Sequence, residues 1–301
     1  MTEEAESLRV EDINPYQWLS HGGSGYVERS PSGHGSRKTR VDTMKLSKIK
    51  TAVGIIRTVR NWPVWFSYFF GMSKGEGTVV YELNSGVKLK LPAKGPDAGI
   101  VSDVWVKKVY TPAGFSIEDG DTVFDIGAHV GVFSIFAAKA AKNVKVYSFE
   151  PFHENFKLLK ENVSMNDATN IVAVNKAIAD KSDRRELYIS PDNQGGNSFY
   201  GGGQHTSKNL VPTISIAEFL AQNSINTIDF LKMDCEGAEY EIFFNCPANV
   251  FKKIRKISME YHNLDDKRNS QTLANLFEKN GYSVQIGGAT RIGMLYAHRL
   301  A

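Results

Sequence analysis

The chain has few cysteines and no long run of uncharged apolar residues, and each absence excludes something. Only two cysteines, Cys235 and Cys246, occur in 301 residues. Because two thiols cannot form a disulfide framework, we expect a reducing compartment and a cytoplasmic protein. No apolar run is as long as a membrane span, and the acidic first residues lack the apolar core of a secretory signal. The net charge of +3 permits an anionic partner and requires none.

The composition is that of a globular protein with three parts. With 42% hydrophobic and 23% charged residues, the chain can bury one sizeable α/β core plus an appendage. Residues 1–42 contain glycine- and serine-rich runs without hydrophobic periodicity, which predicts a disordered arm. Residues 43–95 predict a helix, an aromatic stretch and a β-hairpin. Residues 96–301 predict the main domain, in which strands and helices alternate.

The segment 44–70 combines basic residues with the most aromatic stretch of the chain, Trp62–Phe70. Apolar residues recur every three or four positions from Ile49 to Val59, which predicts a helix. We favour packing of the aromatic side chains on the main domain. The alternative is that these basic and aromatic residues contact a membrane surface.

A strand, a glycine turn and a helix follow one another between residues 121 and 141. The run Val123–Ile126 predicts a buried parallel strand, and residues 132–141 repeat apolar and small side chains at helical spacing. The turn Gly127–Gly131 joins them. This is the pattern of the first crossover in a doubly wound sheet, where glycine lets the backbone approach a ligand and the helix N-terminus offers unpaired N–H groups.

An acid marks the end of the next predicted strand. Glu150, followed by Pro151, lies about 20 residues past the glycine turn, where a carboxylate accepts hydrogen bonds from both hydroxyls of a ribose. The turn and the acid together predict a nucleoside-containing cofactor. The dinucleotide pattern G-x-G-x-x-G would require glycine at Asp125 and Val130, which disfavours a nicotinamide-dependent oxidoreductase. A carboxylate at Asp125 suits instead the cationic amino-acid end of S-adenosylmethionine, which carries no phosphate.

The strand and helix pattern continues to the C-terminus and predicts one open sheet. Ile171–Ile178 predicts the third strand, with Asn175 and Ala177 near the adenine of the cofactor. The blocks 228–239 and 256–262 predict two further strands, and the last segments, from 281 onward, predict a closing antiparallel pair. The predicted fold class is therefore α/β, Rossmann-like and doubly wound, with a small helix and hairpin added at the N-terminus.

Acidic and imidazole side chains gather at the predicted carboxyl ends of the strands, where an open α/β sheet binds its ligand. The positions are Asp125, Glu150, Asn175, Asp234, Glu236, Glu239, Glu260 and His262. One acid at a strand end is usually a helix cap or a solvated side chain. Because these positions lie on successive strands, we interpret them as a functional site.

Four blocks of this sequence together resemble the FkbM family of S-adenosylmethionine-dependent methyltransferases. They are Val123–Gly131, Ser148–Pro151, Ile228–Glu239 and Ser258–His262, in the order and spacing of that family. The resemblance begins near residue 81 and implies that 96–301 is a methyltransferase domain. It implies S-adenosylmethionine as cofactor and a hydroxyl of a sugar, a glycan or a natural product as methyl acceptor. One departure is His129, where the family more often carries asparagine.

The cofactor contacts are expected at the glycine turn and at the two neighbouring strand ends. By position, we assign Asp125 to the ammonium group, Gly127, Ala128 and Gly131 to the methionine part, Glu150 with Pro151 to the ribose, and Asn175 with Ala177 to the adenine.

The implied reaction is an in-line displacement, with the methyl group held about 3 Å from a substrate oxygen. A base helps because a protonated alcohol is a poor nucleophile. His262 is the first candidate, since imidazole accepts a proton near neutral pH, and the alternative is that it only caps a strand end. Asp234 and Glu260 are the other candidates. These two acids also suggest a divalent cation, although two carboxylates alone do not commit us to a bound metal.

Other classes of protein fit the sequence less well. The block Met233–Gly237 is acidic rather than basic, so we expect no nucleic-acid partner. Methylation of nitrogen, of a lipid or of a protein stays open, as does a non-catalytic nucleoside-binding scaffold, because a fold does not determine a function. The glycine-rich loop 193–205 is either a lid or an ordinary exposed loop. The sequence does not indicate an oligomeric state.

Overall fold

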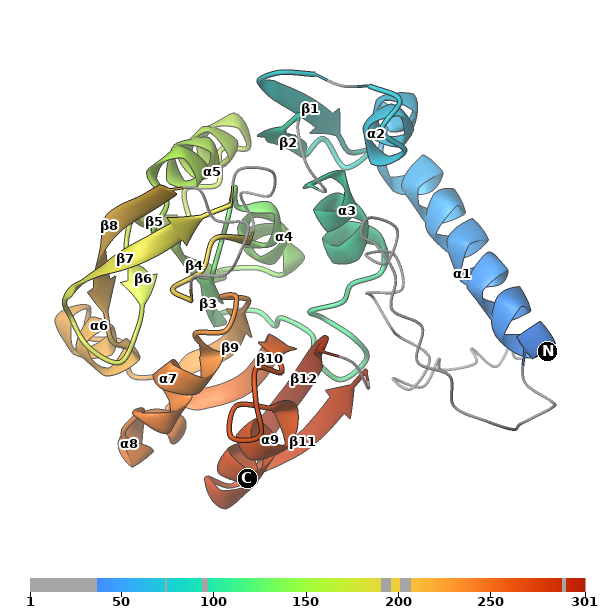
Figure 1. The fold of residues 1–301 in the computed structure, drawn as a ribbon. Coiled ribbons are helices and arrows are strands. Elements are labelled where there is room, and N and C mark those ends of the chain that lie inside the picture. Colours follow the sequence, from blue (N-terminus) through green and yellow to red (C-terminus); the bar gives the residue numbers. More distant parts are fainter. Residues whose placement is uncertain are drawn as a thin grey trace.

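A computed structural model describes residues 37–73, 75–93, 97–190, 196–200, 207–288 and 291–300, with side chains from residue 47 onward. Within these residues the chain forms an α/β fold built on a seven-stranded sheet, accompanied by a three-stranded sheet and a two-stranded hairpin (Figure 1). Most of the predicted arm and most of the predicted loop 193–205 lie outside the described residues.

Five parallel strands form the middle and one edge of the large sheet. They are β3 (Thr122–Ile126), β4 (Lys145–Phe149), β5 (Ile171–Val174), β9 (Ile228–Met233) and β10 (Ile254–His262). The strands β11 (Tyr282–Gly287) and β12 (Ile292–Arg299) close the other edge as the predicted antiparallel pair. The order is β11-β12-β10-β9-β3-β4-β5, which confirms a doubly wound sheet. The order reverses between β3 and β9, so the ligand crevice is expected at their carboxyl ends.

Both faces of the large sheet are covered, because successive side chains of a strand point to opposite faces. On β3, Val123 packs into one hydrophobic core and Phe124 into the other. The first core contains side chains of α4 (Val132–Ala140) and α5 (His153–Met165). The second contains side chains of α6 (Ile216–Gln222), α7 (Glu239–Phe244), α8 (Ala248–Phe251) and α9 (Ser270–Lys279). This double burial explains why the strands are near-continuous apolar runs.

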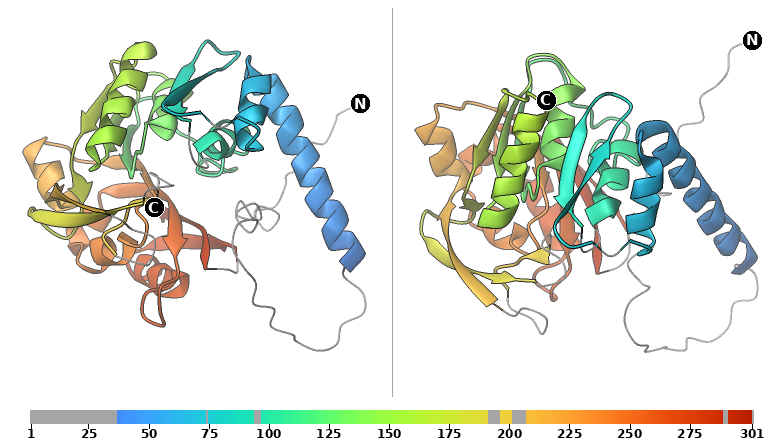
Figure 2. Two further views of the ribbon diagram at one scale, coloured as in Figure 1. Left: turned by 45° about the horizontal axis from the view of Figure 1, so that its top comes forward. Right: turned by 90° about the horizontal axis from the view of Figure 1, so that it is seen from above.

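The N-terminal part consists of helices and a hairpin beside the main sheet. Its elements are α1 (Arg37–Thr58), α2 (Trp62–Phe69), β1 (Thr78–Glu82), β2 (Lys88–Pro92), α3 (Asp97–Val101) and a π-helix, η2 (Ser102–Val106). Figures 1 and 2 show α1 along the outer edge of the molecule. Helix α1 begins at Arg37, so residues 37–42 belong to it and not to the predicted arm. Lysine and arginine are good helix formers, and the basic cluster therefore continues the helix.

Two buried asparagines, one in α5 and one directly after it, join the hairpin to the main domain. The backbone N–H groups of Lys88 and Lys90 donate to the Oδ1 atoms of Asn166 and Asn162, at 2.9 and 2.7 Å. The two amide groups donate back to the carbonyl oxygens of the same lysines. The edge of β2 is thus satisfied by side-chain amides and not by a third strand.

The aromatic stretch packs on the main domain, as favoured from the sequence. Trp65 is buried, and its Nε1 donates to the carbonyl oxygen of Ala98 at 2.7 Å. Phe66, Tyr68 and Phe69 pack against the same core. Phe70 is 63% exposed, so contact of this region with a membrane surface stays an untested prediction. None of the helices in the described residues is long and apolar enough to cross a membrane.

The predicted third strand, 171–178, is divided between two sheets, whereas one open sheet was predicted. Ile171–Val174 pairs with β4, whereas Ala177–Ile178, the strand β6, pairs in parallel with β8 (Ser207–Ile214). The third strand of this small sheet is β7 (Arg184–Ile189). The chain leaves the large sheet at Asn175, whose side-chain amide donates hydrogen bonds to the carbonyl oxygens of Glu150 and Pro151, just after β4. A continuous apolar run cannot reveal such a change of partner, since partner choice is a tertiary property.

Candidate cofactor site and active site

The turn after β3 brings backbone atoms to the wall of the crevice. Gly127 has a φ of +74°, and a Cβ atom there would overlap the carbonyl oxygen of Asp234 after β9. The N–H groups of Gly127 and Ala128 both donate to the carbonyl oxygen of Phe149, at 3.1 and 2.9 Å. The turn is therefore fixed between the ends of β4 and β9, and only glycine fits at position 127.

Glu150 lies directly after β4 and is 5% exposed. Its Oε2 accepts a hydrogen bond from the backbone N–H of His129 at 2.9 Å, and its Oε1 accepts one from Phe152 at 2.8 Å. Burial raises the pKa of Glu150 to about 8, although the two N–H groups act in the opposite direction. The side chain of Asn155 donates a further hydrogen bond to Glu150, and the lone-pair capacity that remains suits a diol such as ribose.

Two adjoining cavities open at the carboxyl ends of the strands, and Ile100, Gly127, His129 and Asp234 line both. The other walls of the first cavity include Glu150, Pro151, Ala177, Ile178, Phe199 and Glu236. Those of the second include Asp103, Tyr110, Ala128, Phe133, Lys232 and Glu260. The first cavity combines an apolar surface, suited to adenine, with a carboxylate suited to ribose. The second combines apolar side chains with three acids and the ammonium group of Lys232.

Two of the residues predicted to contact the cofactor, Asn175 and Gly131, line neither cavity. Asn175 donates from Nδ2 to the carbonyl oxygens of Glu150 and Pro151, at 2.8 and 3.1 Å, so it holds the turn that carries the ribose acid. Gly131 begins α4 with a φ of +84°, and a Cβ atom there would lie 3.1 Å from the side chain of Leu159. Both residues shape the site from behind.

Asp125 also lies behind the cavity walls, and not where an ammonium partner was predicted. Its side chain is fully buried, with Oδ1 3.2 Å from Nζ of Lys232 and Oδ2 accepting the hydroxyl proton of Ser134 at 2.6 Å. Lys232 also donates to the carbonyl oxygen of Gly127 at 2.8 Å. Burial alone would lower the pKa of Lys232, but the neighbouring acids, Asp125 first, raise it above its ordinary value. The geometry makes Asp125 the anchor that holds β9 to the glycine turn.

Among the buried polar atoms without hydrogen-bond partners in the described residues, those of two side chains lie close together near the cavities. The two side chains are Asp97, whose Oδ1 has no partner, and His129, whose ring nitrogens both have none. The Asp97 Oδ1 lies 3.9 Å from Nε2 of His129. Burial raises the pKa of Asp97 to about 7 and lowers that of His129 to about 4, so the imidazole is neutral. Because buried polar atoms are normally paired, this arrangement fits a polar ligand group.

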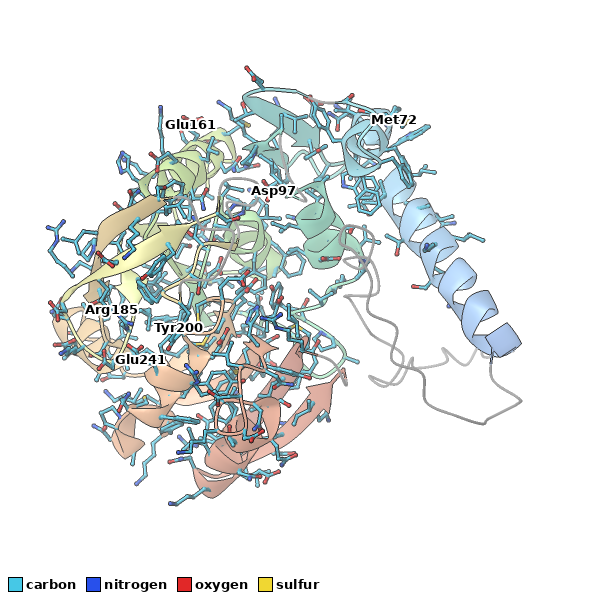
Figure 3. The ribbon with its side chains drawn as sticks, viewed as in Figure 1. Met72, Asp97, Glu161, Arg185, Tyr200 and Glu241 are labelled. Carbon is cyan, nitrogen blue, oxygen red and sulfur yellow. The ribbon has the colours of Figure 1, made fainter. Side chains whose placement is uncertain are left out.

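Asp97 was not identified from the sequence. It opens α3, one turn before the cavity residue Ile100, and Figure 3 shows it on the side of α3 that faces α4. The only signal in the sequence is an acid at the start of a short apolar helix, which normally indicates a helix N-terminus.

His262, at the end of β10, is surrounded by acids. Its Nδ1 lies 3.0 Å from Glu239, and its Nε2 lies 3.2 and 3.5 Å from Glu236 and Glu260. Burial would lower the pKa of His262, but the neighbouring carboxylates of Glu236 and Glu239 raise it well above its ordinary value. An imidazolium cannot act as a base. Of the predicted catalytic residues, Asp234 lines both cavities and Glu260 the second, whereas His262 lines neither.

The described part of the predicted lid loop, residues 196–200, is fastened to the site. Phe199 lines the first cavity, and Ser198 donates from Oγ to the carbonyl oxygen of Glu236 at 2.7 Å. The hydroxyl of Tyr200 donates to Glu241 at 3.4 Å, and the same carboxylate pairs with Arg185 (Figure 3). These bonds tie the segment to β7 and α7, and a lid role for the loop stays a prediction.

These features match the parts of one cofactor. The buried carboxylate of Glu150 suits the hydroxyls of a ribose, the backbone of the glycine turn lines the crevice, and the buried carboxylate of Asp97, with its Oδ1 atom unpaired, suits a cationic ammonium group. A pyrophosphate would instead face Asp234 and Glu236 in the first cavity, which like charge disfavours. The fold and the site thus define an S-adenosylmethionine-dependent methyltransferase with a Rossmann-like sheet.

Comparison with known proteins agrees with this class. The profile of the methyltransferase FkbM domain matches residues 125–284, which is more than half of the chain. The chain belongs to the FkbM methyltransferase family.

The similarity to individual relatives is low. The chain is 22% identical to the 31-O-demethyl-FK506 methyltransferase FkbM of Streptomyces tacrolimicus over 192 residues, which are 54% of this chain and 74% of that protein. It is 20% identical to Methyltransferase 1 of Beauveria bassiana over 206 residues, or 62% of this chain and 81% of that one. The crystal structure of methyltransferase FkbM from Methylobacillus flagellatus KT shares 15% identity, with a TM-score of 0.42 over 79% of this chain and 59% of that chain.

Proposed function

We propose that the protein transfers the methyl group of S-adenosylmethionine to a hydroxyl of a sugar, a glycan or a natural product. One observation carries this proposal: Asp234 lines both cavities, so a carboxylate stands between the space for the cofactor and the acid-lined space beside it. The name of the Streptomyces relative denotes methylation of an oxygen in a natural product, which supports the same kind of acceptor.

Each part of the site has a place in the proposal. Glu150 accepts the ribose hydroxyls, the apolar wall at Ala177 contacts the adenine, and the backbone of Gly127 contacts the methionine part. Asp97 takes the role of ammonium partner that the sequence had suggested for Asp125, because its carboxylate is buried, its Oδ1 atom has no hydrogen-bond partner, and it lies next to His129, which lines both cavities. His129 remains neutral beside it.

The chemistry then depends on positioning and on one proton. When bound, S-adenosylmethionine supplies an electrophilic methyl group. Asp234 accepts the proton that the acceptor hydroxyl loses as its oxygen attacks. The hydroxyl of Tyr110 donates to Oδ2 of Asp234 at 3.0 Å, which orients the carboxylate and leaves its other oxygen for the acceptor. His262 acts behind Asp234, where its contacts with Glu236 and Glu239 hold the strand ends together.

The acids also bear on the type of acceptor. Asp103 and Glu260 line the second cavity, and Glu236 lines the first. A phosphate backbone at this rim would meet like charge, so the expected partner is a neutral polyhydroxylated compound and not a nucleic acid.

Calorimetry with S-adenosylmethionine, S-adenosylhomocysteine and NAD tests the cofactor, and transfer of a radiolabelled methyl group tests the reaction. We expect micromolar binding of the two sulfur compounds, none of NAD, and label in hydroxylated acceptors drawn from sugars and polyketides. Matched amine analogues serve as controls. Label that enters the amines and not the alcohols would contradict O-methylation.

Asp97 is expected to make cofactor binding depend on pH. An ammonium group beside Asp97 favours the ionised carboxylate, so binding expels the proton that Asp97 holds below its raised pKa of about 7. Affinity for S-adenosylhomocysteine should therefore rise from pH 6 to pH 8. Tyr81 and His129 face Asp97 and both stay neutral, because burial raises the pKa of Tyr81 and lowers that of His129. Calorimetry in buffers of different ionisation enthalpy measures the released proton.

The variant Asp97→Asn should bind roughly 10-fold more weakly, through loss of one charge-assisted hydrogen bond, and should release fewer protons. Asp266→Asn, at an exposed acid near α9, is the matched control. Equal affinity and equal proton release in both variants would remove Asp97 from the cofactor site.

A further inference from the structure

The side chains at the ends of β9 and β10 surround a point that suits a divalent cation. Ligand atoms of Asp234, Glu236 and His262 all lie within 4.8 Å of one another. The Nε2 atom of His262 is buried and makes no hydrogen bond of good geometry, although oxygens of Glu236 and Glu260 are 3.2 and 3.5 Å away. Two atoms at about 2.1 Å from one metal, in octahedral directions, are about 3 Å apart. The spacing at Nε2 is therefore that of ligands sharing a cation.

Glu239 orients His262 for such a role. Its side chain is fully buried, and its Oε1 lies 3.0 Å from Nδ1 of the ring. When the carboxylate accepts the Nδ1 proton, the lone pair of a neutral imidazole is on Nε2, on the side of Asp234 and Glu236. A carboxylate behind a histidine is the usual way in which proteins orient a histidine that ligates a metal.

The turn after β9 holds Glu236 toward the same point. Glu236 has a φ of +53°, an unusual conformation for a residue other than glycine, and Gly237 follows with a φ of +100°. Ser198 donates to the carbonyl oxygen of Glu236, and the backbone N–H of Gly237 donates to Glu239 at 3.2 Å. The Glu236 side chain keeps 30% exposure, so this ligand is reached from the first cavity.

The balance of charge favours a cation as well. The carboxylates of Asp234, Glu236, Glu239 and Glu260 lie around His262 and the cavity walls, and the buried Lys232 nearby is paired with Asp125 at 3.2 Å. Neighbouring carboxylates in a partly buried site repel one another unless a positive charge compensates them. In the metal-free protein the proton on His262 and the ammonium group of Lys232 supply part of that charge, and a dication bound at Nε2 would take the place of the proton.

We infer that Asp234, Glu236 and His262 bind one divalent cation of the Mn²⁺ or Mg²⁺ class, with Glu260 beside them. Two carboxylates and one imidazole form an oxygen-rich set, which suits these hard cations better than a thiolate site does. Because Asp234 lines the second cavity as well as the first, an open position of the cation can face the acceptor space. That last point rests on the proposed function: a hydroxyl bound to the cation loses its proton more readily.

The test measures binding alone, without cofactor or acceptor. The full chain is treated with EDTA, desalted and titrated with Mn²⁺ while electron paramagnetic resonance follows the free ion. We expect one saturable site per chain, and pulsed spectra should show coupling of Mn²⁺ to a ¹⁴N nucleus that is lost in His262→Gln. Glu236→Gln should weaken binding at least 10-fold. Glu239→Gln should weaken it roughly 10–100-fold through the orientation of His262.

Glu154→Gln, at an exposed acid of α5, is the matched control and should bind Mn²⁺ as the wild type does. Circular dichroism checks that each variant is folded. If His262→Gln is unfolded, the affinity of Glu236→Gln for Mn²⁺ tests the inference instead. Absence of a saturable site, unchanged affinity in Glu236→Gln, or bound Mn²⁺ without nitrogen coupling in the wild type would each overturn the inference. Since no methyl transfer is measured, these outcomes leave the proposed function untouched, and failure of methyl transfer leaves Mn²⁺ binding untouched.

Discussion

Replacing Lys232 with methionine is expected to lower the free energy of unfolding by about 3–5 kcal/mol. The substitution keeps the length of the apolar stem but removes the charge that compensates Asp125, and both side chains are at most 5% exposed. The carboxylate then keeps one hydrogen bond, from Ser134, and no ion pair in the described structure. Removing one partner of a buried pair costs more than the pair contributes, because the other charge stays buried. Chemical denaturation monitored by circular dichroism measures the loss.

The double variant Asp125→Asn with Lys232→Met should recover much of that stability, since it leaves no charge uncompensated. Lys208→Met is the matched control: Lys208 pairs with Glu186 at 2.7 Å, but both side chains are about half exposed. Its midpoint of denaturation should stay at the wild-type value within error. A Lys232→Met protein as stable as the wild type would show that the anchor between β9 and the glycine turn contributes nothing.

Replacing Glu150 with glutamine is expected to weaken cofactor binding by roughly 100-fold. Glutamine cannot accept the two hydrogen bonds that a ribose donates, and each such bond to a charged group is worth about 1.5–3 kcal/mol. Its NH₂ group would also face the backbone N–H of either His129 or Phe152, which now donate to Glu150. The turn that carries the site would therefore lose a hydrogen bond as well. Calorimetry with S-adenosylhomocysteine measures the effect.

The pH dependence of this binding has a defined sign. Below its raised pKa of about 8, Glu150 is largely protonated in the free protein, and the two ribose hydroxyls favour the ionised form. Wild-type affinity should thus keep rising toward pH 8, and this part of the rise should be absent in Glu150→Gln. Glu154→Gln, four positions further on and exposed, is the matched control. Equal affinity in the two variants would exclude Glu150 from the ribose site.

The parts of the site that follow one another along the chain were predictable from the sequence. The strand, turn and helix around Gly127 are local, and the acid at Glu150 follows the next strand directly. The start of helix α6, Ile216–Gln222, is also marked locally, by a capping box at Ser215 and Glu218. The closing antiparallel pair was also predicted. Local patterns were sufficient because each element shows its own periodicity and its own ends.

The contacts between distant segments were not predictable in this way. The sequence suggested Asp125 as the ammonium partner and did not single out Asp97, because both are acids next to apolar runs and only the folded chain decides that Lys232 pairs with Asp125. It treated 171–178 as one strand, although hydrogen bonds from Asn175 divide it. It proposed His262 as a base, whereas the ring lies among three acids that no spacing rule brings together.

The sequence by itself determined the doubly wound α/β class, the glycine turn, the acid directly after the second strand of the main domain and the resemblance to a methyltransferase family. These features rest on periodicity and on residue types at fixed short spacing, and both can be recognised without knowledge of the fold. Only the tertiary structure decided which carboxylates are paired, which are left unpaired at the cavities, and which meet at His262. Those properties depend on burial and on distances between strands far apart in the chain, since the charge state of a group is set by what surrounds it in space.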